Sequence, residues 1–451
     1  MTATEPHPMV NLPPGPRWPA PVQAIAFSVF RPETVLAQAH RYGPSFSAKL
    51  PLFGQATVIT EPPLIKQLFL SPPTEMETID PSLDLMFGKG STFGLRGDQH
   101  RRRRKLLTPP FHGKRMRAYE AMIEEETLKE IATWPDDEEF SVLPSSMRIT
   151  LNVILRAVFG ADGKELQELR ELVPAWVEFG SRLFGLRFLH HDLGPWSPWG
   201  RHLAKRRQFD RIVDSLIDKA RADRDFENRD DVLSLMLQAR YEDGAAMSRQ
   251  EIGDELATLL AAGHETTATT LAWALERLQR NPGVLAELVE AIDEGDDKFL
   301  QATVYEVQRV RPVIDGVVRR VAAPTVTLGQ WVLPHGHHVF VSATAVHNDP
   351  ALYPNPDKFD PLRFLGKSPD NFAWVPFGGG NRRCIGAAFA NMEMLVVLRT
   401  ILRHRALQPT SAPNERQKYR GVAFAPARGG RVLLHRRNPA TQVKPTTNAG
   451  G

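Results

Sequence analysis

The chain has 451 residues, of which 42% are hydrophobic and 24% are charged, as in ordinary globular proteins. Its net charge of +4 is mildly basic and falls short of the character of nucleic-acid-binding proteins. The single cysteine excludes an intramolecular disulfide framework and a zinc site built from several cysteines, and it favours a reducing compartment, so we expect a cytoplasmic protein.

The two ends of the chain differ in composition from the part between them. The proline-rich run LPPGPRWPAP predicts a stiff lead-in over residues 1–20, while residues 437–451 lack periodicity and are predicted to be disordered. No window of about 18 apolar residues and no signal-peptide pattern occurs, so we expect no membrane anchor. Because no internal linker or repeat is found, residues 21–436 are predicted to form a single domain.

Short alternating runs at residues 47–61, 325–345 and 429–437 predict hairpins and small sheets. Within the second run, the proline and glycine of LPHGHH predict the tip of a hairpin, which we prefer to a metal-binding tract. Helical periodicity dominates residues 97–312. The predicted fold class is therefore mainly α with minor β sheets.

The clearest helical pattern lies in the middle of the chain. Ser248 and Glu251 have the spacing of a capping box, and apolar residues then recur in steps of three and four. The sequence Asn281-Pro282-Gly283 ends the pattern. A helix of about 30 residues spans about 45 Å, which is enough to cross a whole domain.

The only cysteine, Cys384, stands in the run FGGGNRRCIGAAFA, where a glycine-rich loop meets a helical pattern. At such a junction, backbone N–H groups and the helix dipole favour a thiolate, which a metal ligand or a nucleophile requires. A structural thiol is the usual fate of a free cysteine, but it needs neither the glycines nor the arginines of this run. A nucleophile would need a positioned histidine, and no local pattern selects one. The remaining interpretation is a single axial thiolate to haem iron.

The same run matches the pattern F-x-x-G-x-R-x-C-x-G through Phe377, Gly380, Arg382, Cys384 and Gly386. In this pattern the chain resembles the cytochrome P450 family. The resemblance covers roughly residues 11–436 and implies the cytochrome P450 fold, with a long central helix over a haem. It also implies heme b as the cofactor, Cys384 as the iron ligand, and Phe377, Gly378 and Gly386 as cofactor-binding residues.

The run AAGHETT, in the middle of the long helix, is similar to the family's oxygen-activation motif. Gly263 would let the helix pass close to a flat cofactor. The resemblance makes Glu265 and Thr266 the catalytic acid and alcohol, which would supply protons for cleavage of the O–O bond of bound O2. The alternative is a helix with a glycine weak spot and a solvated glutamate.

Three further charges resemble the family's E-x-x-R and P-x-R-F motifs. The run YEVQR places Glu306 and Arg309 on one face of a helix, and PLRF supplies Arg363. In the family, these charges form a buried ion network that shapes the cysteine loop. The expected role is structural.

The basic run at residues 101–105 has a solvated helix face as its plain interpretation, and nucleic-acid binding has little support because no aromatic residues interleave with it. The resemblance implies that His100 and Arg104 face the two haem carboxylates, joined by Arg319 and Arg382. The other basic residues of the run would remain outside, where an acidic redox protein could bind them.

The resemblance places substrate-facing segments at residues 73–96, 171–200, 313–318 and 422–424. The predicted substrate pocket contains Ala262, Val313, Ile314, Asp315, Val317 and Phe424. Most of these residues are apolar, and segment 171–200 is rich in aromatic residues, which favours an apolar substrate, although such aromatics belong more often to a core. For Asp315 two roles remain open: contact with a polar end of the ligand or a nearby water, or a hydrogen bond to local backbone.

The resemblance implies a haem-thiolate monooxygenase that uses O2 to hydroxylate a C–H bond of an apolar small molecule, such as a lipid, steroid or terpenoid. Electrons from NAD(P)H would arrive through a ferredoxin reductase and a ferredoxin, because the chain contains no flavin domain. We expect a monomer. The alternatives are a peroxide-driven or isomerising haem-thiolate enzyme and a haem sensor or ligand-binding protein without turnover. Neither alternative would need Glu265 and Thr266.

Overall fold

The computed structural model describes residues 9–29, 31–50, 53–78, 83–111, 115–160, 163–183, 186, 189–420 and 423–437. Residues 1–8 of the predicted lead-in and residues 438–451 of the predicted tail lie outside this part of the chain. Arg437, at the start of the predicted tail, donates its backbone N–H to the carbonyl oxygen of His404 over 3.0 Å and pairs with Asp293. None of the described helices combines the length and the apolar character that a membrane span requires.

Helices make up most of the described chain, as predicted. They are α1 (Ala20–Val29), α2 (Arg31–Tyr42), α3 (Pro62–Leu70), α4 (Leu83–Phe87), α5 (Gly97–Leu107), α6 (Arg115–Ile131), α7 (Leu143–Phe159), α8 (Lys164–Leu183), α9 (Pro198–Ala222), α10 (Val232–Gln238), α11 (Arg249–Leu278), α12 (Pro282–Glu294), α13 (Asp297–Val310), α14 (Ala343–His347) and α15 (Ala387–His404).

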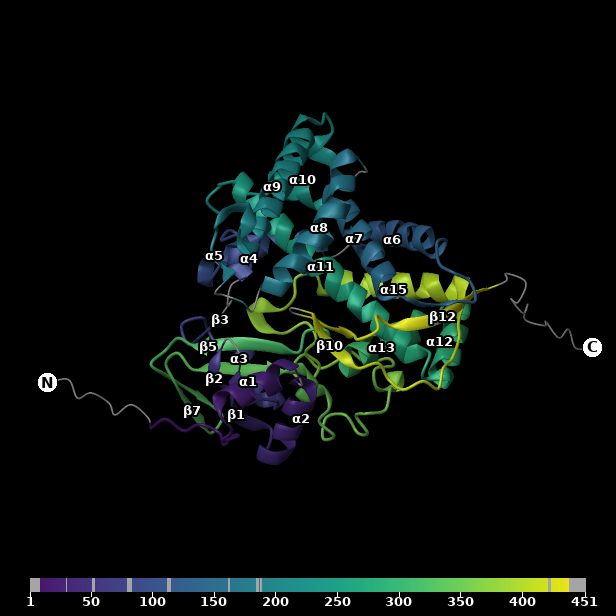
Figure 1. Ribbon diagram of the computed structural model, residues 1–451. Coiled ribbons are helices and arrows are strands. Elements are labelled where there is room, and N and C mark those ends of the chain that lie inside the picture. Colours follow the sequence, from purple (N-terminus) through teal and green to yellow (C-terminus); the bar gives the residue numbers. More distant parts are fainter. Residues whose placement is uncertain are drawn as a thin grey trace, which may run out of the picture.

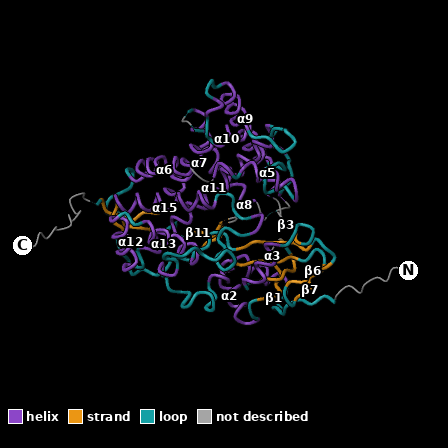
Figure 2. Tube along the Cα trace, turned by 180° about the vertical axis from the view of Figure 1, so that it is seen from behind, coloured by secondary structure: helices purple, strands orange, loops and turns teal. Residues whose placement is uncertain are grey.

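The strands form small sheets. They are β1 (Ser45–Leu50), β2 (Gly54–Ile59), β3 (Met76–Thr78), β4 (Glu139–Ser141), β5 (Gly316–Val321), β6 (Thr325–Leu328), β7 (Trp331–Pro334), β8 (His338–Ser342), β9 (Arg405–Leu407), β10 (Gln417–Arg420), β11 (Ala423–Pro426) and β12 (Arg431–Arg436). Among the described residues, their order is β1-β2-β8-β5-β3 in the largest sheet, β4-β12-β9 in the next, and β10-β11 and β6-β7 in two pairs. The largest sheet lies to one side of the helical part (Figure 2).

Helix α11 runs through the middle of the molecule, with α8, α9 and α10 above it and α13 below it in Figure 1. Its predicted capping box is confirmed, because Ser248 accepts from the backbone N–H of Glu251 and the Glu251 carboxylate accepts from that of Ser248. The predicted end is confirmed as well, since α11 stops at Leu278 and Pro282 begins α12. The helix therefore passes through the main hydrophobic core, where it packs most extensively on α7.

One predicted hairpin is wrong. The turn within LPHGHH connects β7 to β8, but these two strands do not pair with each other. Strand β7 pairs with β6 through the turn at Gly329, whereas β8 pairs with β2 and β5 in the largest sheet. Because alternation gives strands but not their partners, the sequence pattern could not distinguish a hairpin from a connection between two sheets.

Candidate active site

The loop from Phe377 to Cys384 is closed on itself and packed on helix α3. The backbone N–H of Cys384 donates to the carbonyl oxygen of Phe377 over 2.9 Å, and Gly378 and Gly380 both have φ of +64°. A Cβ atom at Gly380 would lie 2.2 Å from the carbonyl oxygen of Phe69. The glycines are therefore required by positive φ and by close approach to a neighbouring backbone.

The Cys384 side chain is exposed, yet the surrounding protein raises the pKa of its thiol through burial. Because Cys384 is accessible although protein surrounds most of it, we infer that it borders an opening. The backbone N–H of Gly386, where α15 begins, and the guanidinium groups of Arg104 and Arg383 act in the opposite direction on that pKa. The junction thus favours the thiolate as expected, but in the chain alone burial has the larger effect on the pKa. A bound metal cation would reverse the balance.

Helix α11 presents one accessible face in its middle. Between Ile252 and Leu278, every residue is buried except Ala262, Gly263 and Thr266. Thr266 lies four residues after Ala262 and three after Gly263, so it shares a side of the helix with each of them. The Thr266 hydroxyl donates to the carbonyl oxygen of Ala262 over 2.8 Å. The helix therefore borders an opening at the place where the sequence predicts that a flat cofactor lies.

Glu265, beside this face, is buried, and its carboxylate makes no hydrogen bond to another described residue. Burial raises the pKa of its carboxyl group, while Arg420 lowers it and Glu178 raises it further. A carboxyl group with a raised pKa retains its proton to higher pH, which suits a proton donor.

Four basic side chains predicted to hold the haem carboxylates gather near the cysteine loop. The pKa of His100 is lowered to about 3, first by burial and then by the guanidinium groups of Arg382, Arg104 and Arg319. Burial, followed by Arg382, also lowers the pKa of Arg319 to about 10. Within the described residues, neither Arg104 nor Arg319 pairs with an acidic side chain. At this pKa His100 is neutral, but the buried Arg319 and the half-buried Arg104 and Arg382 repel one another, which indicates an anionic ligand between them.

The other basic residues of the run, Arg101, Arg102 and Lys105, are exposed as expected, but Arg103 is not. Arg103 is 1% exposed and pairs with Glu251 and Glu255 on α11. This position was missed because a run of like charges gives no sign of which member turns inward. The remaining members pair with acids at the surface: Arg101 with Asp98, Arg102 with Asp243, and Lys105 with Glu242.

The structure brings Glu306, Arg309 and Arg363 together. The Nε atom of Arg309 lies 2.7 Å from Oε2 of Glu306, and Nε of Arg363 lies 3.6 Å from Oε1 of the same carboxylate. The carbonyl oxygen of Arg309 lies 3.1 Å from Nδ1 of His347, and Nε2 of His347 accepts from the backbone N–H of Val375. This network therefore reaches the segment that leads into the cysteine loop.

The predicted pocket residues separate into two groups. Ala262, Ile314 and Val317 have accessible surface. Phe424 is 2% exposed, and it is held by main-chain bonds, since its N–H donates to Val313 and its carbonyl oxygen accepts from Trp273. Phe424 and Val313 are thus core residues, and their placement in the pocket is corrected.

Asp315 takes the second of its two expected roles. Its Oδ1 atom accepts from the backbone N–H of Thr344 over 2.8 Å and from the hydroxyl of Ser342 over 3.1 Å. The side chain is 1% exposed. It therefore fixes the start of helix α14, while its Oδ2 atom is buried without a hydrogen-bond partner among the described residues.

The aromatic residues of segment 171–200 also belong largely to the core. Trp176 and Trp199 are buried, and the Trp199 ring stacks on His202 with 4.9 Å between centroids. Trp196 is 91% exposed. Phe184 and Phe188 lie outside the described residues.

Sequence reasoning missed the loop at residues 88–95, which was assigned to the substrate pocket. Arg382 donates to the carbonyl oxygens of Thr92 and Leu95 in this loop, so the loop belongs to the surroundings of the cysteine. The available signal was the spacing of Gly88, Gly90 and Gly94 in GKGSTFG. An accessible deep thiol, a helix with one open face and buried cations without an acid together fit a flat, anionic, iron-containing cofactor such as haem.

Comparisons with known proteins agree with a haem site. The family model described as Cytochrome P450 matches residues 13–430. "Putative cytochrome P450 138" of Mycobacterium tuberculosis is 54% identical over 437 residues, which cover 97% of this chain and 99% of the relative. "Putative cytochrome P450 135B1" of the same organism is 37% identical and covers 98% of this chain and 95% of the relative.

A solved structure titled "Retinoic acid bound cyanobacterial CYP120A1" superposes with a TM-score of 0.82 at 23% identity, covering 95% of this chain and 100% of that chain. A second one, "Crystal structure of a Cytochrome P450 (CYP102L1)", has a TM-score of 0.79 at the same identity and coverage. At this identity the likeness shows the fold alone. With the family match over nearly its whole length, the chain belongs to the cytochrome P450 family and is a haem-dependent monooxygenase.

Proposed function

We propose that this P450 uses O2 to hydroxylate a C–H bond of an apolar small molecule, with electrons from NAD(P)H delivered by a ferredoxin reductase and a ferredoxin. The observation that carries the proposal is the open face of α11, where Ala262 and Thr266 are accessible beside the buried acid Glu265. Haem supplies the activation of O2 when it is bound. The residues of the chain position it and handle the protons.

Cys384 would be the iron ligand, and the cluster of His100, Arg104, Arg319 and Arg382 would hold the two carboxylates of the cofactor. Arginine suits this task because its planar group of donors can contact both oxygens of a carboxylate. The absence of an acidic partner for Arg104 and Arg319 among the described residues supports this assignment.

Glu265 and Thr266 would move protons toward the open face of α11. The raised pKa of Glu265 keeps a proton on its carboxyl group to higher pH. The Thr266 hydroxyl is half-buried and now donates to the carbonyl oxygen of Ala262, so rotation about one bond frees its proton. A buried acid with a neighbouring hydroxyl is a suitable pair for general acid catalysis.

The accessible side chains of Ala262, Ile314 and Val317 support an apolar substrate. For the ferredoxin, the candidate contacts are the half-buried Arg383 in the cysteine loop and the exposed basic residues of α5. We further propose that residues 21–436 form one catalytic domain that acts as a monomer. The single cysteine supports a reducing, cytoplasmic location.

The test is turnover with a surrogate ferredoxin and ferredoxin reductase on a panel of apolar molecules, chosen by the spin-state shift that each produces on binding. We expect a hydroxylated product whose yield for each NADPH consumed falls in the variant Thr266→Ala. NADPH consumption without product from any molecule that shifts the spectrum would overturn the proposal. Equal turnover with hydrogen peroxide alone would favour the peroxide-driven alternative.

A further inference from the structure

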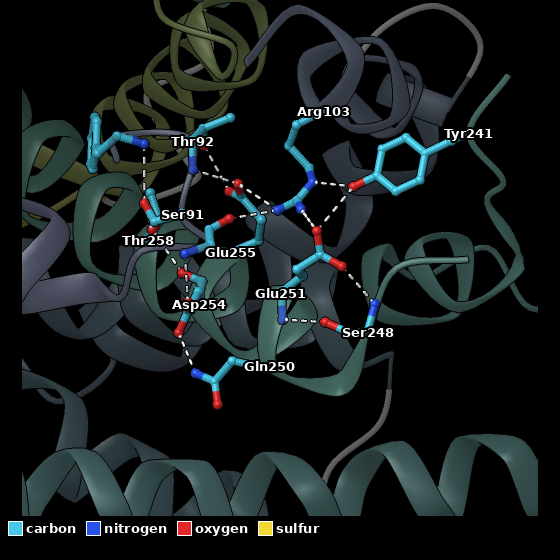
Figure 3. A network of polar contacts seen from close by, with 12 residues as sticks. Ser91, Thr92, Arg103, Tyr241, Ser248, Gln250, Glu251, Asp254, Glu255 and Thr258 are labelled. Atoms are coloured by element: carbon cyan, nitrogen blue, oxygen red, sulfur yellow. Dashed lines mark hydrogen bonds and ion pairs between the residues drawn. The ribbon is translucent and has the colours of Figure 1, made fainter. Parts of the chain in front are cut away.

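Glu255 on α11 is fully buried and binds the loop at residues 88–95 (Figure 3). Its Oε1 atom accepts from the backbone N–H of Thr92 over 2.5 Å, and its Oε2 atom accepts from the Thr92 hydroxyl over 2.7 Å. Arg103, from α5, contacts the same carboxylate over 3.3 Å. One turn later on α11, the hydroxyl of Thr258 lies 2.7 Å from that of Ser91. Two successive residues of the loop, Ser91 and Thr92, are thus attached to α11.

The neighbouring acid, Asp254, attaches the preceding residues of the loop. Its Oδ2 atom accepts from the backbone N–H of Gly90 over 2.9 Å. A Cβ atom at Gly88, where φ is +100°, would lie 2.1 Å from the Asp254 carboxylate. Only glycine leaves room for this approach, so the loop sequence is adapted to α11.

The other side of the loop holds Arg382. One of its terminal nitrogens donates to the carbonyl oxygen of Thr92 over 2.8 Å, and the other donates to that of Leu95. Thr92 therefore lies between the Glu255 carboxylate and the Arg382 guanidinium, and it is bonded to both through its own atoms. Two carbonyl acceptors fix the plane of a guanidinium group, because its donors are arranged in a rigid fork.

We propose that Glu255 is a positioning residue for the cofactor: by holding Thr92, it sets the orientation of Arg382 toward the haem carboxylate. The inference rests on the proposed role of Arg382 in holding that carboxylate. Groups that orient the direct contacts of a metal cofactor tune its affinity and its electronic properties. Glu255 acts through Thr92 and touches neither the cofactor nor the substrate.

A purely structural role is the competing explanation, since removing one partner of a buried ion pair destabilises a protein wherever the pair lies. The chain offers a matched control in Glu276, which is equally buried on the same helix. Glu276 pairs with Arg277 and accepts from the backbone N–H of Glu415, far from the loop at residues 88–95. The variants Glu255→Gln and Glu276→Gln therefore make the same chemical change at the two ends of α11.

The experiment uses the haem-loaded protein and measures two quantities: the rate of haem transfer to apomyoglobin and the midpoint reduction potential of the haem. We expect Glu255→Gln to release haem about tenfold faster, an effect typical of residues that orient cofactor contacts. Its potential should become more negative, because the positive charge of Arg382 is held less firmly at the carboxylate. Glu276→Gln should match the wild type in both quantities.

Thr92→Val removes the hydroxyl bond to Glu255 but keeps the backbone N–H bond, so it should change both quantities in the same direction by a smaller factor. If Glu255→Gln does not fold, Thr92→Val alone tests whether the contact between Glu255 and Thr92 positions Arg382. Haem release and potential that are unchanged in Thr92→Val and in Glu255→Gln, or that change equally in Glu276→Gln, would overturn the inference. Failure of the proposed function would look different, because the wild type itself would then lack the spectrum of thiolate-ligated haem.

Discussion

Two buried ion networks flank the cysteine loop, and they differ in how the sequence encodes them. The Glu306 network consists of Glu306, Arg309 and Arg363, and its central pair lies three residues apart on one helix. The Glu255 network consists of Thr92, Arg103, Glu251 and Glu255, and it joins positions more than 140 residues apart. The first network can be read from motif spacing, whereas the second becomes visible only when the chain is folded.

Both networks reach the cysteine loop, but from different sides. The Glu306 network extends through His347 to the backbone of Val375, ahead of the loop. The Glu255 network extends through Thr92 to Arg382, just before Cys384. The comparison indicates that the first network fixes the path of the chain into the loop and that the second orients a side chain of the loop.

The largest expected effect on stability comes from removing the central charge of the Glu306 network. Glu306→Gln leaves Arg309, which is 0% exposed, without its counter-charge, and this should lower the free energy of unfolding by about 3–5 kcal/mol. Urea unfolding followed by far-ultraviolet circular dichroism measures the change. A loss below about 1 kcal/mol would show that the network contributes no more than an exposed pair.

The Glu255 network should show itself in the pH dependence of stability. Burial raises the pKa of Glu255 to about 7, against the opposing hydrogen bonds from Thr92 and Arg103. As the pH rises above about 4.5, the unfolded chain releases this proton first, so the folded protein loses stability until about pH 7. The loss for Glu255 amounts to about 3 kcal/mol. We expect the free energy of unfolding of the wild type to fall by this amount between pH 4.5 and 8, relative to that of Glu255→Gln.

Glu276 provides the control for that pH dependence. Burial acts to raise the pKa of Glu276, but the hydrogen bonds and charge of Arg277, the backbone N–H of Glu415 and the charge of Arg280 together outweigh it, so the pKa is lowered. Its contribution to stability is therefore present at neutral pH and is lost only in acid, as the pH falls through the lowered pKa. Glu276→Gln should differ from the wild type by a constant amount between pH 5 and 8. An equal slope for both variants would contradict the assignment to Glu255.

A smaller effect concerns the loop that lies between the two networks. Gly380 and Gly295 both have positive φ, but only at Gly380 would a Cβ atom collide with a neighbour, the backbone oxygen of Phe69. Gly295→Ala should cost about 1–2 kcal/mol for its backbone conformation alone. Gly380→Ala should cost about 1 kcal/mol more because of the collision. Equal losses in the unfolding midpoint would mean that the loop moves away from Phe69 at little cost.

The smallest effect is expected at the surface beside the Glu255 network. Lys105 and Glu242 are both 72% exposed at the side chain, and their nitrogen and oxygen atoms lie 2.8 Å apart. Exposed pairs are screened by water and salt, so Lys105→Met should leave the urea midpoint unchanged within error at low and at high salt. A clear, salt-dependent drop would indicate that this pair strengthens the attachment of α5 to the turn before α11.

The features that the sequence predicted correctly are local. The capping box of α11, its end before Pro282 and the spacing of Glu306 and Arg309 each depend on residues a few positions apart. The burial of Arg103 could not be predicted in the same way, because its acidic partners lie about 150 residues away. Periodicity shows that a helix has a polar face, but not which member of a basic run meets a distant carboxylate.

The bonds of Asp315 and the wrongly predicted hairpin before β8 have a common cause. Asp315 is bound by Ser342 and Thr344, which become its neighbours only because β5 pairs with β8. Because β8 pairs with β5 and β2, it does not pair with β7, and the expected hairpin does not form. Strand partners are set by the whole sheet, so neither outcome could be inferred from alternation within a single run.

Ligation of haem iron by Cys384 is tested most directly by the absorption spectrum of the reduced protein with carbon monoxide bound. The wild type should show the long-wavelength Soret band of thiolate-ligated haem, and Cys384→His should bind haem but lose that band. Haem in the wild type without this band, or a band that persists in Cys384→His, would contradict the assignment of the cysteine loop as the haem-binding loop.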